Sequence, residues 1–297
     1  METIQRVVIT EVGGVDVLKI VETSCSPPAP GFARRATEYS GFTGGDISMR
    51  KGIYPDQKPA PLTPVYFFFV ERVQAVGEGC TQIQQAYTIA TQIAKVDKNQ
   101  RVFVHGISGA DGCALMIPCS LMGAEVYGTA SERNQKLFRA YGATPFVYTD
   151  KKWIAAMKDV GAGHAVLDPL GFESFEERYS ILTSDGIIVA YGNNMDSLAG
   201  PRLRDPTTAI MKMLSWNSDS PSGKKTTFFG RDRDSPNYAN DVSALMNMMA
   251  EGRFQVSIKK VWAMGDVEAT YRQWGGGHGI GSVLIKIHDL GLSQGLA

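Results

Sequence analysis

The sequence lacks the marks of several protein classes, beginning with paired cysteines. Its four cysteines form no C-x-x-C pair, which argues against a zinc knuckle or a redox dithiol; they are Cys25, Cys80, Cys113 and Cys119. Cys113 and Cys119 lie six residues apart on a predicted helix and therefore face different ways. We expect free, mostly buried thiols.

Histidine is also sparse, with four residues in the chain and none among the first hundred. A catalytic zinc in the N-terminal part would need histidine ligands, so we expect no metal. Thirty basic and thirty acidic residues cancel, which leaves no electrostatic footprint for nucleic acid. No apolar run is long enough to cross a bilayer, and the first ten residues lack the pattern of a signal peptide. We therefore expect a cytoplasmic protein with no membrane partner.

The stretch from residue 101 to residue 131 carries the strongest motif. It predicts a strand, a glycine turn, a helix and a second strand, at 102–104, 106–112, 113–122 and 125–129. Such a unit binds dinucleotides, because glycines let the backbone approach a pyrophosphate at a helix N-terminus. The run is I-x-G-x-x-G, with Ile107 in the first position, and Asp111 places a carboxylate where it would repel the pyrophosphate. A strand-to-helix turn without a ligand is the alternative.

The rest of the chain supports an α/β fold. Strands and helices alternate from Glu132 to Ala190, which predicts a doubly wound parallel sheet with helices on both faces. The first eighty residues are rich in β-formers, with an antiparallel pair expected at 4–10 and 17–21. The β pattern returns after Arg253.

Several motifs resemble those of the medium-chain dehydrogenase/reductases, nearest to the zinc-independent, zeta-crystallin-like quinone oxidoreductases. In chain order they are MRKGIYP, QAVGEG, VFVHGISGADG, AEVYGTAS, LDPLGFESF, GIIVAYG, TTFFG and MAEGRF. The resemblance implies a Rossmann domain over 85–253 that binds NADPH, inside a split GroES-like catalytic domain over 1–84 and 254–297. It also implies reduction of a quinone or an α,β-unsaturated carbonyl without zinc, and homodimerisation through Thr226–Phe229.

The resemblance assigns the cofactor contacts by position. In the glycine turn, Gly106, Ser108, Gly109 and Gly112 match the family, whereas Ala110 and Asp111 depart from it. A small hydroxyl residue and cations after the second strand favour a 2′-phosphate, hence NADPH; they are Ser131, Arg133 and Lys136. Glu132 argues against NADPH unless it serves only as a helix N-terminal charge, and a plain exposed lysine is the alternative for Lys136. Tyr148 matches a ribose contact, with a plain strand-end tyrosine as the alternative. The segments expected to line the nicotinamide are Tyr191-Gly192 and Phe229-Gly230.

Two departures bear on catalysis. Gln85 follows only six residues after Gly79, so the GroES-like domain lacks a few dozen residues that would close its barrel in the family. In the substrate pocket Thr43 replaces an asparagine and Phe67 an acidic residue, while Asp46 and Tyr54 match.

Tyr54 is the candidate proton donor, with a packing tyrosine as the alternative, and Thr43 is a weaker candidate to hold the substrate carbonyl. Besides an active reductase, the sequence allows a catalytically impaired NADPH-binding or regulatory paralogue. It also allows the truncated gene product of such a reductase.

Overall fold

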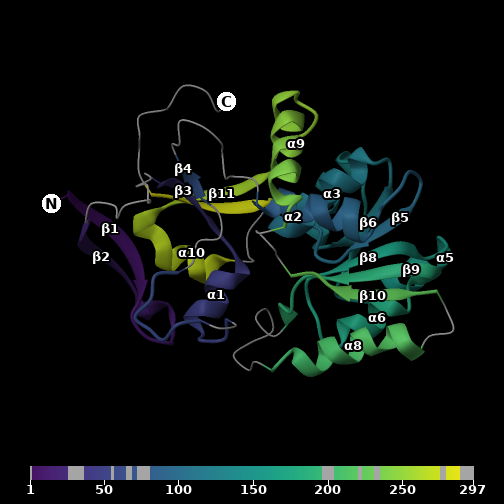
Figure 1. Cartoon of the computed structure of the whole chain (residues 1–297), viewed down its shortest axis with the longest axis horizontal. Helices are drawn as coiled ribbons and strands as arrows, with labels where there is room; N and C mark the ends of the chain where they lie inside the picture. Colours follow the sequence, from purple (N-terminus) through teal and green to yellow (C-terminus); the bar gives the residue numbers. More distant parts are fainter. Residues whose placement is uncertain are drawn as a thin grey trace. The chain divides into compact units, whose positions relative to one another are not determined.

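The computed structural model describes residues 2–25, 37–54, 57–64, 69–71, 81–195, 204–219, 223–230, 235–274 and 279–287. The chain divides into two compact units (Figure 1). Unit 1 is made of Met1–Thr81, Ile258–Gly277 and Ser282–Ala297, and unit 2 of Gln82–Ser257 and His278–Gly281. That these units correspond to a GroES-like and a Rossmann domain with boundaries at 84 and 253 stays a prediction.

Unit 2 is built on a parallel sheet of six strands. They are β5 (Arg101–Val104), β6 (Glu125–Ala130), β7 (Thr144–Val147), β8 (Gly163–Asp168), β9 (Leu182–Ala190) and β10 (Lys225–Phe228). Their order across the sheet is β10-β9-β8-β5-β6-β7. The chain runs outward from β5 to β7 and then returns to β8, on the other side of β5. This is the doubly wound dinucleotide-binding order, so the predicted fold class is confirmed, and its switch point lies between β5 and β8.

Helices precede, connect and follow these strands. They are α2 (Thr81–Thr88), α3 (Ala110–Leu121), α4 (Gln135–Ala140), α5 (Trp153–Asp159), α6 (Ser174–Tyr179), α8 (Thr207–Asp219) and α9 (Tyr238–Ala250). A π-helix follows α2 at Ile89–Ile93, and a 3-10 turn precedes α4 at Glu132–Asn134. Figure 1 shows α6 and α8 on the opposite side of the sheet from α3. Under α5 and α6, a buried core forms around Phe103 and Trp153, whose rings stack with centroids 5.1 Å apart.

Unit 1 holds an antiparallel hairpin and a mixed four-stranded sheet. The hairpin pairs β1 (Glu2–Ile9) with β2 (Leu18–Cys25), as the sequence predicts. The sheet has the order β11-β12-β3-β4, formed by β11 (Ile258–Ala263), β12 (Ser282–Lys286), β3 (Thr37–Phe42) and β4 (Phe69–Glu71). Val283 lies opposite Phe42, so a strand from the N-terminal part of the chain and one from the C-terminal part pair in one sheet.

The short elements of unit 1 are α1 (Gly44–Arg50), α10 (Val267–Gln273) and two 3-10 turns at Val15–Val17 and Met264–Asp266. Phe42 and Tyr271 pack edge to face in its core, with ring centroids 4.6 Å apart. Two parts of the predicted barrel, Phe67 and the Gly77–Gly79 turn, lie outside the described residues.

Candidate dinucleotide site

A glycine turn joins β5 to α3 beside the switch point of the sheet. Gly106 has a φ of +66°, and Gly109 is the N-cap of α3. A Cβ on Gly112 would lie 2.4 Å from the carbonyl oxygen of Gly106, so this turn closes only with glycine there. The Cys113 N–H bonds to the Gly109 carbonyl at 2.9 Å, and the first-turn N–H groups ahead of it have no helical partner. Such a turn suits an anion.

Strand β6 fixes the turn in place. The Gly106 N–H donates to Thr129 Oγ1 at 2.9 Å, and the Ile107 N–H donates to the Thr129 carbonyl at 2.9 Å. A Cβ on Gly128 would lie 2.5 Å from the Val104 carbonyl, so β5 and the turn approach β6 closely at this point. The backbone of the turn is therefore held by β6 rather than by side chains of its own.

The predicted cofactor residues all lie at one edge of the sheet. They follow the carboxyl ends of β5 (Gly106, Ser108, Gly109, Gly112), β6 (Ser131, Arg133, Lys136), β7 (Tyr148), β9 (Tyr191, Gly192) and β10 (Phe229, Gly230). Ligands of doubly wound sheets bind at this edge. Arg133, Lys136 and Tyr148 are exposed, and Ser131 is half-buried. The structure thus brings these residues to one edge, and their contacts with a cofactor stay a prediction.

The tyrosine after β9 is unusual. Its hydroxyl is buried and has no hydrogen-bond partner among the described residues. Burial raises the pKa of Tyr191 well above 10, and the charges of Asp111 and Asp168 raise that pKa further. Tyr191 therefore keeps its proton and can act only as a neutral hydrogen-bonding group.

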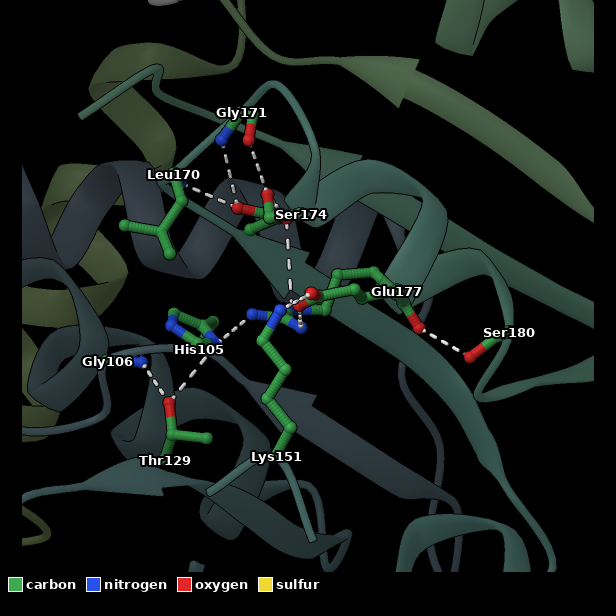
Figure 2. A network of polar contacts seen from close by, with 11 residues as sticks. His105, Gly106, Thr129, Lys151, Leu170, Gly171, Ser174, Glu177 and Ser180 are labelled. Atoms are coloured by element: carbon green, nitrogen blue, oxygen red, sulfur yellow. Dashed lines mark hydrogen bonds and ion pairs between the residues drawn. The ribbon is translucent and has the colours of Figure 1, made fainter. Parts of the chain in front are cut away.

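Asp168, the last residue of β8, organises the loop that leads to α6. Its Oδ1 accepts from the N–H groups of Leu170 at 2.6 Å and Gly171 at 3.3 Å, and its Oδ2 accepts from Ser174 Oγ at 2.5 Å (Figure 2). The carboxylate and the serine are buried. This loop borders the switch point, so Asp168 sets the backbone there.

Beneath that loop a buried arginine meets a histidine. Arg178, 1% exposed, donates to Nδ1 of His105, the residue directly after β5. Thr129 Oγ1 lies 3.2 Å from the same nitrogen (Figure 2). Because arginine can only donate, Nδ1 is the acceptor and the ring hydrogen is on Nε2. Burial, and then the charge of Arg178, lower the pKa of His105 well below 6.5, so the ring is neutral.

The charge of Arg178 is balanced by two carboxylates and one aromatic face. Its Nε lies 3.9 Å from Asp168 Oδ2, and its Nη1 lies 3.3 Å from Glu177 Oε2. Its guanidinium carbon lies 4.2 Å from the centre of the Trp153 ring. Burial lowers the pKa of Arg178, and the two carboxylates oppose that shift.

Sequence reasoning missed this network. A signal was present, because Arg178 falls three residues after Phe175 and three before Ile181, on the buried side of α6. A charged residue in an apolar helix stripe predicts a buried partner.

The predicted catalytic residues lie in unit 1, where two of them cap a helix. Thr43 is the N-cap of α1, and its N–H and hydroxyl donate to Asp46 Oδ2 at 2.9 and 3.1 Å. Asp46 is fully buried, and this raises its pKa to about 7 against the hydrogen bonds from Thr43. Tyr54 packs half-buried against the core of unit 1. Thr43 and Asp46 therefore have a clear structural role, and the catalytic assignment of all three stays a prediction.

Other sequence predictions concern metals, thiols and membranes. Among the described residues no group of histidine, cysteine and carboxylate side chains could hold a metal ion. Cys113 and Cys119 are free and buried, as predicted, and burial raises the pKa of each thiol to about 12. The side chain of Cys25 and all of Cys80 lie outside the described part of the chain. No described helix has the length and hydropathy of a membrane span.

Comparison with known proteins agrees with this geometry. No family model matches the chain. The human synaptic vesicle membrane protein VAT-1 homolog is 21% identical over 94% of this chain and 85% of its own length. The medium chain reductase pydE of Acremonium sp is 27% identical over 73% of this chain and 61% of its own length.

Solved structures share the fold over nearly the whole chain. The human VAT-1 homolog-like protein has a TM-score of 0.78 at 16% identity, covering 97% of this chain and 99% of its own. A quinone oxidoreductase from Coxiella burnetii has 0.75 at 14%, covering 97% and 100%. The mycobacterial protein Rv1454c, solved in complex with NADPH, has 0.75 at 17%, covering 95% and 99%.

The fold is that of the medium-chain dehydrogenase/reductases. The chain is similar in sequence to VAT-1 homologs and to a medium chain reductase, and similar in fold to quinone oxidoreductases. The alignment with the human VAT-1 homolog spans 338 positions but takes in only 94% of the 297 residues, or about 279, so about 59 positions are gaps in this chain. The chain is therefore shorter than this relative over the aligned span, and the place of the deletion, between Gly79 and Gln85, stays a prediction.

Proposed function

We propose that this protein is an NADPH-dependent oxidoreductase that reduces a quinone or an α,β-unsaturated carbonyl without a metal. One observation carries the proposal: the glycine turn lies at the switch point of a doubly wound sheet, with its first-turn N–H groups directed to the carboxyl edge. The relatives named as reductases and quinone oxidoreductases, and the one solved with NADPH, support the reaction and the cofactor.

The residues around the turn fit NADPH rather than NADH. An NAD enzyme places a carboxylate at the end of the second strand to bind the ribose hydroxyls. Here that strand ends at Ala130 and Ser131 follows, with the exposed cations Arg133 and Lys136 in the next turn. A small hydroxyl group and two cations suit a 2′-phosphate.

When bound, the nicotinamide supplies a hydride, and the protein has to orient the acceptor and provide a proton. Tyr54 is the proposed donor of that proton, with water as the alternative source. Thr43 is proposed to hold the acceptor carbonyl, although its hydroxyl is shared with the α1 capping box. Asp46 completes that box, and we propose that it acts by keeping Thr43 in place.

A second candidate is a protein that binds NADPH without turnover. The capping box favours it, because the hydroxyl of Thr43 and the carboxylate of Asp46 are already engaged with each other. The deletion that the sequence predicts in the catalytic region, between Gly79 and Gln85, favours it as well.

The two candidates are separated by acceptor-dependent turnover. NADPH oxidation is measured with a panel of quinones and enones for the wild type, Tyr54→Phe and Tyr141→Phe. Tyr141 is an exposed tyrosine of unit 2 outside the site, so it controls for the exchange itself. Turnover that Tyr54→Phe reduces at least tenfold and Tyr141→Phe leaves unchanged supports the reductase. NADPH binding with no turnover on any acceptor selects the second candidate.

A further inference from the structure

The glycine turn contains a negative charge of its own. Asp111 is the second residue of α3 and stands among the first-turn N–H groups that would receive a diphosphate. Its side chain is half-buried, so the carboxylate is partly withdrawn from bulk water. A carboxylate here stabilises the helix through the positive end of its dipole, which is the same field that would attract a phosphate.

The charge of Asp111 acts across the carboxyl edge of the sheet. It raises the pKa of Tyr191, which follows β9, after the larger effect of burial. It also raises the pKa of Cys113 on α3, again after burial. Asp168 at the end of β8 adds a second negative charge near Tyr191. The charge of Asp111 therefore acts on groups of two different elements at this edge, whereas the charge of Asp168 is paired with that of Arg178.

The side of the turn formed by Gly106 and Gly109 is open to an incoming ligand. No atom lies within 4 Å of a Cβ built on Gly106, and Gly109 is exposed. The close approach of Gly112 to the Gly106 carbonyl keeps the helix end fixed against the turn. An incoming diphosphate would meet a preformed set of donors and, within the same turn, one fixed like charge. Like charges a few ångströms apart repel strongly where water is partly excluded.

We infer that Asp111 weakens diphosphate binding at the 106–112 turn and thereby sets a low affinity for the dinucleotide. This inference rests on the proposed function. It makes Asp111 an affinity-determining residue rather than a catalytic one. The adenosine 2′-phosphate end of the ligand, which meets Arg133 and Lys136 in the proposed function, is left unaffected.

The test is calorimetric titration at low ionic strength, where charge effects are least screened. The ligands are NADPH and 2′-AMP, which has the adenosine and the 2′-phosphate but no diphosphate. The proteins are the wild type, Asp111→Asn, Asp111→Val and Asp159→Asn. Asp159 is an exposed carboxylate at the end of α5, which leads into the opposite edge of the sheet, so its variant makes the same charge change away from the turn.

Both Asp111 variants are expected to bind NADPH at least tenfold more tightly than the wild type, with 2′-AMP affinity unchanged. Asp159→Asn should match the wild type for both ligands, and added salt should reduce the advantage of Asp111→Asn. Equal or weaker NADPH binding by both Asp111 variants overturns the inference. Unchanged binding of 2′-AMP serves as the control that unit 2 of each variant is folded.

Failure of the proposed function gives a different pattern. Tighter NADPH binding by the Asp111 variants without turnover on any acceptor leaves the inference standing and removes the reductase. Absence of NADPH binding in the wild type and in both Asp111 variants overturns both.

Discussion

Arg178 donates a hydrogen bond to Nδ1 of His105, so a buried cation rests against a neutral imidazole. The pair joins the end of β5 to α6, while Asp168 ties the same arginine to the end of β8 at 3.9 Å. The two strands concerned flank the switch point of the sheet. The backbone that would contact a dinucleotide is therefore supported by one buried polar network.

Removing the arginine should destabilise unit 2. Arg178→Met keeps much of the side-chain length but leaves Asp168 without a cation and His105 Nδ1 without its charged donor. We expect a loss of about 3 kcal/mol in the free energy of unfolding, because a broken buried pair leaves an uncompensated charge. Arg253→Met is the control, since Arg253 is half exposed and its ion pair with Glu251 is 3.8 Å long. Thermal melts that give equal losses for both variants would contradict this.

His105 should make the protein sensitive to acid. Its pKa is lower in the folded chain than the ordinary 6.5, so the unfolded chain binds the extra proton first. Stability is therefore full above about pH 6.5 and falls by up to about 1.4 kcal/mol for each pH unit below it. His105→Gln retains an acceptor for Arg178 and does not titrate. The melting temperature of His105→Gln should rise relative to that of the wild type as the pH falls.

The control for this effect is His164→Gln. His164 is another half-buried histidine of unit 2, and its Nδ1 accepts from the Arg101 N–H at 3.0 Å. This variant retains His105 and should keep the acid sensitivity of the wild type. If His105→Gln loses stability with acid as steeply as His164→Gln, the inference that the His105 ring is neutral in the folded chain is wrong.

Asp46 should change the stability of the protein with pH in the direction opposite to His105. Burial raises its pKa from 3.8 to about 7, so the folded chain holds a proton that the unfolded chain has released. Its contribution is fully present below pH 3.8 and is lost as the pH rises through 7. Asp46→Asn can still accept from the Thr43 N–H and does not titrate.

The melting temperature of Asp46→Asn should therefore rise relative to that of the wild type as the pH is raised from about 4 to 7, with no further change above. A difference between Asp46→Asn and the wild type that stays constant or shrinks over this range would rule out a protonated Asp46.

Alanine substitutions at two glycines of the same turn, Gly112 and Gly109, should differ sharply in their effect on the free energy of unfolding. A Cβ at position 112 would lie 2.4 Å from the Gly106 carbonyl and 2.7 Å from Ile107 Cα, both backbone atoms that cannot yield cheaply. Gly112→Ala should lower the free energy of unfolding by about 3 kcal/mol. At Gly109 the Cβ would be 3.4 Å from the same carbonyl, so Gly109→Ala should cost less than about 1 kcal/mol. Denaturation curves in which the two variants coincide would contradict the turn geometry.

The sequence predicted the fold more fully than the polar interior. The alternation of strands and helices predicted the doubly wound sheet, because hydrophobic periodicity and glycine turns are local features of the sequence. The termini of α3, found at Ala110 and Leu121, lay within a few residues of the prediction. The contact between Arg178 and His105 joins residues 73 positions apart, and only the folded sheet brings them together. The capping role of Thr43 and Asp46 is local, but the resemblance to a family drew attention to catalysis instead.

Cofactor choice should depend on the two cations after β6. Arg133 and Lys136 are exposed and follow Ser131, so they suit a 2′-phosphate. They are not needed to bind the free ribose hydroxyl of NADH. Arg133→Ala combined with Lys136→Ala should weaken NADPH binding by tenfold or more and leave NADH binding within about twofold, because charge-assisted hydrogen bonds to phosphate are lost only in NADPH. Arg139→Ala is the control, since Arg139 lies on the same helix and is also exposed, with a hydrogen bond to Gln135. Parallel titrations of the two dinucleotides measure the effect, and an equal loss for NADH and NADPH would show that these cations do not read the 2′-phosphate.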